Sequence, residues 1–285
     1  MLLLALGIAG AQSLIRVDSS LVIVPAHVTT SIGASVTDLT KEQFRLFEDN
    51  VEQKIAYFAK DDAPVSVGIV FDASGSMRNK MRKSSQAAAA FFKTANPEDE
   101  FFLVEFNERP WLAVPFTDDS DVLYERISRT HVLGRTSLLD AIHLALAQMK
   151  KARNTRKAIV IVSDGGDNRS HKTAGQVKSA MLESDVQVYA MGIFDPDPPK
   201  TIEERNGPQL LDDLAEESGG RHYRVGDIDD LPHIAERIGN DLRNQYVLGY
   251  VPANDDRDGR YRKIRLTTDP SLRVYYRRGY FAPIQ

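Results

Sequence analysis

The pattern of hydrophobic and polar residues divides the chain into a middle part and two flanks. In the middle part, fully apolar runs alternate with helical stretches, as in a mainly parallel sheet that is covered by helices on both faces. The expected strands are residues 65–71, 101–106, 111–116, 158–162, 186–193 and 221–225. The expected helices are residues 77–92, 138–151, 174–183, 209–217 and 231–243, and residues 195–208 are expected to form a loop. This pattern predicts a doubly wound α/β domain.

The two flanks show a β pattern with turn residues between short runs. Each flank alone has too few strands to form a stable unit. We therefore expect residues 12–62 and 245–285 to pair into one small antiparallel β-sandwich, into which the α/β domain, residues 63–244, is inserted. The alternative is that the flanks are separate arms on the same core.

Residues 1–8 are mostly apolar and are followed by Ala9-Gly10-Ala11. A short apolar run that ends in A-x-A is typical of a secretory signal peptide, with cleavage after Ala11. Residues 1–11 are therefore predicted to be the remnant of a signal, and the protein is predicted to be secreted or periplasmic, within the cell envelope. The alternative is that this run is a buried first strand.

Composition excludes several classes of protein. The chain has 285 residues, a net charge of −4 and no cysteine, so disulfides, thiolate zinc sites and cysteine nucleophiles are absent. The slight acidity argues against nucleic acid or an anionic membrane as the main partner. No stretch approaches the roughly 20 consecutive apolar residues of a transmembrane helix.

Side chains with oxygen donors follow two of the predicted strands. Asp72, Ser74 and Ser76 come after strand 65–71, and Asp164 follows strand 158–162. Thr136 lies in a Gly-Arg-Thr-Ser loop before the next helix. Because ligands gather where parallel strands end, we expect these side chains to meet at one edge of the sheet.

Two carboxylates and three hydroxyls are hard donors that suit Mg²⁺ or Mn²⁺ better than zinc or copper. Neutral hydroxyls leave the ion with most of its charge, so that it can accept a carboxylate from outside. Helix capping by Asp72, Ser74 or Ser76 is the alternative, but it leaves Thr136 and Asp164 unexplained. A serine nucleophile would need a base, and the chain has no G-x-S-x-G motif.

The order D-x-S-x-S, then Thr136, then a strand-terminal Asp164 resembles the von Willebrand factor type A domain, over about residues 64–244. The resemblance implies a metal-ion-dependent adhesion site. In it, Ser74 and Ser76 would bind the metal directly, and Thr136 would be a further metal ligand that engages with ligand binding. Asp72 and Asp164 would act on the metal largely through water. The flanks are similar to those of a group of secreted bacterial proteins with this domain, through residues 37–49, 246–250 and 278–280.

We therefore expect a non-enzymatic module that binds another protein through Mg²⁺, or through Mn²⁺ or Ca²⁺. The partner would supply an Asp or Glu carboxylate to the ion. Two alternatives remain at this point: a structural or assembly module of the cell envelope with a vestigial metal site, and a metal-assisted hydrolase.

Overall fold

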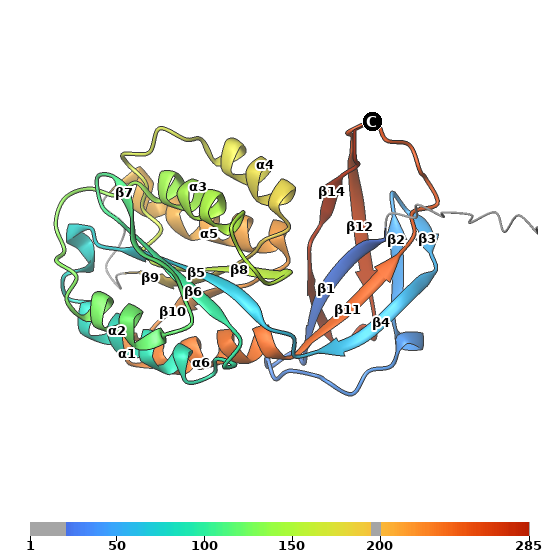
Figure 1. The fold of residues 1–285 in the computed structure, drawn as a ribbon, viewed down its shortest axis with the longest axis horizontal. Helices are drawn as coiled ribbons and strands as arrows, with labels where there is room; N and C mark the ends of the chain where they lie inside the picture. The colour runs from blue at the N-terminus through green and yellow to red at the C-terminus, as the bar shows by residue number, and fades with distance from the viewer. Residues whose placement is uncertain (1–20, 195–200, 285) are drawn as a thin grey trace, which may run out of the picture.

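The computed structural model of the protein describes residues 21–194 and 201–284. A layered α/β domain lies beside a pair of antiparallel sheets (Figure 1). The predicted signal remnant, residues 1–11, lies outside the described residues. No helix of the described ranges is both long enough and apolar enough to cross a membrane.

The central sheet of the α/β domain has six strands in the order β10-β9-β8-β5-β6-β7. All neighbours are parallel except β6 and β7, which form an antiparallel hairpin. Every residue of β5, β6 and β9 is buried, which explains why these segments are apolar on both faces. The strands are β5 (Val65–Asp72), β6 (Glu100–Phe106), β7 (Pro110–Thr117), β8 (Arg156–Ser163), β9 (Gln187–Ile193) and β10 (His222–Val225).

Helices cover both faces of this sheet (Figure 1). One face packs against α1 (Met81–Phe92), α2 (Ser120–Ser128) and α6 (Leu231–Arg243). The other packs against α3 (Leu138–Met149), α4 (Ala174–Ser184) and α5 (Ile202–Ser218). The predicted fold class, a doubly wound and mainly parallel sheet, is therefore confirmed.

The flanks pair with each other in two four-stranded antiparallel sheets around a shared apolar core. The first sheet, in the order β13-β1-β11-β4, contains β1 (Val22–Thr29), β4 (Ile55–Asp61), β11 (Gln245–Tyr250) and β13 (Arg273–Tyr276). The second, in the order β14-β12-β2-β3, contains β2 (Arg45–Glu48), β3 (Val51–Gln53), β12 (Tyr261–Thr267) and β14 (Gly279–Phe281). Because each sheet mixes strands from both flanks, the flanks are not separate arms. The limits assigned to the domains from sequence stay a prediction.

Three sequence expectations about helices were wrong. Residues 202–208, expected in a loop, belong to α5 despite Pro208, because the side chains of Thr201 and Glu204 form a capping box that starts the helix there. The helix expected from residue 77 begins at Met81, after a short 3-10 turn, Gly75–Met77. Helix α2 was not expected; its start is fixed by Asp119, whose side chain accepts the N–H of Asp121.

The two domains are joined at the amino end of the parallel sheet. Strand β4 ends at Asp61 and β5 begins at Val65, while α6 ends at Arg243 and β11 begins at Gln245. The carboxyl ends of β5 and β8 therefore point away from the β-sandwich (Figure 1). This edge, called the carboxyl edge below, is the place where the sequence predicts the site.

A buried polar cluster connects the two domains near α6. The Nε2 atom of His27, on β1, lies 3.5 Å from Oδ1 of Asp241 on α6 and 3.0 Å from the hydroxyl of Ser35. The other carboxylate oxygen of Asp241 accepts a hydrogen bond from Tyr223. Burial, together with the positive charges of Arg221 and Arg237, lowers the pKa of His27 to about 4. Burial raises the pKa of Asp241 to about 6.

Replacing His27 by Gln is predicted to change how stability depends on pH. In the folded protein His27 stays neutral down to about pH 4, whereas the unfolded chain takes up that proton from its ordinary value of 6.5. The wild type therefore loses stability as pH falls through this window, and the variant lacks that loss. The free energy of unfolding can be measured with urea for both proteins at pH 7 and at pH 4.5. Between these two pH values, the wild type should lose about 2 kcal/mol more of it than His27→Gln loses. An unchanged difference would contradict the burial of a neutral imidazole.

Candidate functional site

The loop after β5 brings three of the predicted side chains together. Asp72 is fully buried at the end of the strand, and its Oδ1 accepts the N–H of Ser74 at 2.8 Å. The hydroxyls of Ser74 and Ser76 lie 3.0 Å apart. Ser74 precedes the 3-10 turn but makes no capping hydrogen bond, and the residue at the start of α1 is Lys80. Helix capping therefore does not account for the two serines.

The loop after β8 meets this loop through a residue that the sequence did not single out. The hydroxyl of Ser163, the last residue of β8, donates to Oδ2 of Asp72 at 2.6 Å. Asp164 follows it, and its Oδ1 accepts the N–H of Gly166 at 3.4 Å. The loop is tightly packed against α5, since a Cβ on Gly165 would come within 2.9 Å of the Gly207 backbone.

Lys80 is the second residue that sequence reasoning missed. Its ammonium group lies 3.6 Å from Oδ2 of Asp164 and donates to the carbonyl of Ile193 at 2.9 Å. The side chain is almost completely buried, although a lysine in a turn between a strand and a helix would usually be solvated. Its position in the sequence, eight residues after Asp72, gave no signal of this contact.

Thr136 lies in a loop that is bonded to both of the others. The N–H of Gly75 donates to the carbonyl of Gly134 at 3.1 Å, next to the serine loop. The N–H of Thr136 donates to Oδ1 of Asn168 at 3.2 Å, and the N–H of Asn168 returns a bond to the Thr136 carbonyl. Hydrogen bonds therefore connect the three loops that carry the five predicted residues.

Asp167 shapes this loop system from behind. Its Oδ2 accepts the N–H of Leu139, in the first turn of α3, at 3.2 Å. Its Oδ1 accepts the N–H of Ser170 at 3.1 Å. Asp167 thus serves as a turn residue that holds the start of α3.

Electrostatics at the site favour an added positive charge. Burial, followed by repulsion from Asp164, raises the pKa of Asp72 to about 7 despite the hydrogen bonds from Ser163 and Ser74. The ammonium group of Lys80 lies beside Asp164, and no described ion pair joins a cation to Asp72. A divalent cation near Asp72 would offset the free-energy cost of burying this carboxylate and of its repulsion by Asp164.

The donor chemistry fits a hard divalent cation. The predicted ligands are oxygens alone, three of them from hydroxyls, which Mg²⁺ accepts together with water. The described part of the chain holds no cluster of three or more His, Asp or Glu side chains that could bind a metal. The predicted ligands contain only two carboxylates, so they do not form such a cluster. Histidine is not among the described hydrogen-bond partners of Ser74 and Ser76, so neither serine is paired with the base that a nucleophile needs.

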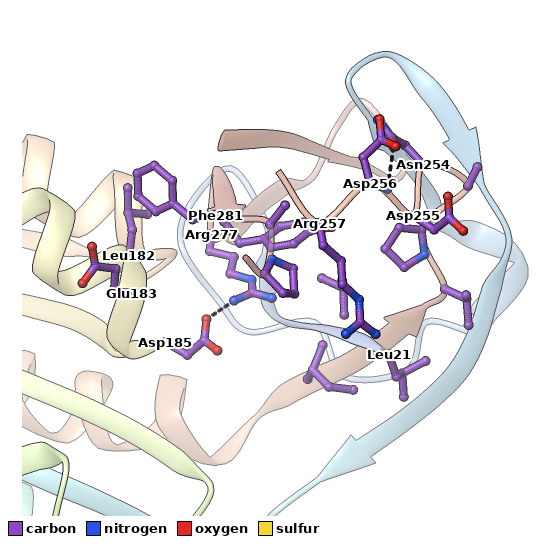
Figure 2. A pocket seen from close by; sticks show the side chains of 18 residues that line it. Leu21, Leu182, Glu183, Asp185, Asn254, Asp255, Asp256, Arg257, Arg277 and Phe281 are labelled. Atoms are coloured by element: carbon purple, nitrogen blue, oxygen red, sulfur yellow. Dashed lines mark hydrogen bonds and ion pairs between the residues drawn. The ribbon is translucent and has the colours of Figure 1, made fainter. Parts of the chain in front are cut away.

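A large cavity lies elsewhere in the molecule. It has a volume of about 1070 Å³ and lies between α4 and the β-sandwich, where Arg277 forms an ion pair with Asp185 (Figure 2). None of the five predicted site residues lines it. The chemistry of the carboxyl edge is therefore separate from this cavity.

Comparison with known proteins finds a family match over the part of the chain that carries these loops. Residues 67–166, which include Asp72, Thr136 and Asp164, match the von Willebrand factor type A domain. An uncharacterized protein of Borreliella burgdorferi is 24% identical over 188 residues, or 58% of this chain. The chain spans 55% of the length of that relative.

Solved structures share the fold. A von Willebrand factor type A protein from Catenulispora acidiphila superimposes with a TM-score of 0.54 and 14% identity, over 85% of this chain and 74% of that one. Proximal thread matrix protein 1 from the mussel byssus, with a zinc-occupied metal-ion-dependent adhesion site (MIDAS), gives a TM-score of 0.52 and 16% identity, over 68% of this chain and 49% of that one. The α/β domain therefore has the same fold as these structures, and residues 67–166 of it match the von Willebrand factor type A domain.

Proposed function

We propose that the protein is a divalent-metal-dependent protein-binding module. Ser74, Ser76 and Thr136 would hold the ion, with Asp72 and Asp164 behind them. The observation that carries this proposal is the hydrogen-bonded convergence of the serine loop and the β8 loop on the buried Asp72 carboxylate. The family match and a mussel neighbour with zinc in its MIDAS support it.

Each residue has a distinct part in this proposal. Asp72 fixes the Ser74 N–H and the Ser163 hydroxyl, and so sets the shape of both loops. Ser74 and Thr136 are buried whereas Ser76 is exposed, so a ligand would approach over Ser76. The bound ion would supply an electrophilic centre for a carboxylate of the partner. The module would bind reversibly and break no bond.

The wider context of this function stays a prediction. A secreted or envelope location depends on residues 1–11, which lie outside the described residues. The partner is defined here by its chemistry, an Asp or Glu side chain. A structural module with a vestigial site is the competing interpretation, and the two variants below separate it from the proposal.

The variant Asp72→Asn should lose metal-dependent stabilisation and gain stability without metal. At pH 8 the wild-type carboxylate is charged, buried and repelled by Asp164, and the neutral amide removes that cost. In thermal unfolding with EDTA, the melting temperature of the variant should lie a few degrees above that of the wild type. Added Mg²⁺ should raise the melting temperature of the wild type alone. A wild type that responds neither to Mg²⁺ nor to EDTA would argue for the vestigial site.

The variant Lys80→Gln should show the opposite behaviour. Glutamine can still donate to the Ile193 carbonyl, but Asp164, the carboxylate that repels Asp72, loses its neighbouring positive charge. Without metal we expect a loss of about 1–3 kcal/mol in the free energy of unfolding. Saturating Mg²⁺ should stabilise this variant more than the wild type, because the ion replaces the missing charge. Equal Mg²⁺ responses in urea unfolding would show that Lys80 and the ion do not act on the same carboxylates.

A further inference from the structure

Exposed arginines lie on the loops around the proposed metal site. We call Arg78, Arg109, Arg135 and Arg169 the arginine rim; all four are exposed. They come from four different segments: the loop after β5, the β6–β7 turn, the loop before α3 and the loop after β8. None of their side chains forms an ion pair with another described residue. Four unpaired guanidinium groups on one edge create a local positive field in a protein of net charge −4.

The other half of the carboxyl edge has the opposite charge. The exposed acidic residues there follow β9 and β10 and are Glu203, Glu204, Asp227, Asp229 and Asp230. Asp229 is paired with Lys83 at 2.6 Å. Because the strand order is β10-β9-β8-β5-β6, the proposed metal site, between β8 and β5, lies at the boundary between the acidic half and the arginine rim.

The basic half also contains an exposed acidic residue, Glu108. The side chain of Glu108 lies against the backbone of Gly134, where a Cβ would meet its Cγ at 3.0 Å. His171 and Lys172, also on the β8 loop, contact Asp140 through their backbone N–H groups. These contacts leave the balance of exposed charge beside the site positive.

We propose that the partner is a protein segment with several carboxylates, one for the metal site and the others for the arginine rim. This rests on the proposed function. Arginine binds carboxylates through two parallel hydrogen bonds, which gives the rim both charge and geometry for such a tract. The segment extends from the site over the β5 and β6 loops, away from Glu203 and Glu204. A flat anionic membrane would meet the acidic half as well, whereas a narrow peptide avoids it.

The test measures binding of two fluorescent peptides by anisotropy, at low ionic strength and with Mg²⁺. The acidic peptide carries one Asp flanked by Glu residues, and the second carries one Asp flanked by Gln. The acidic peptide should bind the wild type about tenfold more tightly than the Gln peptide. The double variant Arg109→Glu with Arg135→Glu should abolish this preference. The control, Lys54→Glu with Lys150→Glu, changes the net charge equally at exposed positions away from the carboxyl edge and should retain it.

The outcomes separate the two proposals. Equal, Mg²⁺-dependent affinities for both peptides would overturn the acidic tract and leave the metal function standing. Preference for the acidic peptide that survives EDTA but is lost in the rim variant would support the tract and overturn the metal function. Absence of binding by either peptide would overturn the inference. The inference would also be overturned, in favour of a membrane, if the protein sediments with phosphatidylglycerol vesicles and the acidic peptide does not reduce this binding.

Discussion

The burial of a carboxylate at the end of β5 is the constraint on which the site depends. Asp72 has no exposed surface, and its neighbour Asp164 carries the same charge, so that both burial and repulsion raise its pKa to about 7. The protein offsets this with hydrogen bonds from Ser163 and Ser74 and with Lys80 beside Asp164. Such an arrangement costs stability without a cation, which is a common property of sites that are built for a ligand.

The fold presents this site at the end farthest from the β-sandwich. Both connections between the domains lie at the amino edge of the parallel sheet, so the carboxyl edge is left to the loops (Figure 1). The sandwich instead contacts the α/β domain through buried groups such as His27 and Asp241. The division of exposed charge on the carboxyl edge would then give the proposed ligand a direction, from the proposed metal site toward the arginine rim.

Much of this arrangement could be predicted from the sequence because it depends on local patterns. Buried parallel strands are apolar on both faces, and their carboxyl ends place Asp72 and Asp164 at one edge. Contacts between distant segments left no such pattern. The bond from Ser163 to Asp72 and the burial of Lys80 against Asp164 depend on how the loops pack. The early start of α5 depends on a two-residue capping box that outweighs Pro208.

The most direct test of the central claim is anomalous diffraction from crystals of the protein grown with Mn²⁺. We predict a single anomalous peak at the carboxyl edge, at coordination distance from the hydroxyls of Ser74 and Ser76, with Thr136 facing it. The peak should be absent in Asp72→Asn crystals grown in the same way. A wild-type crystal that shows no peak there, or a peak that persists in the variant, would contradict the claim that these loops form a cation site.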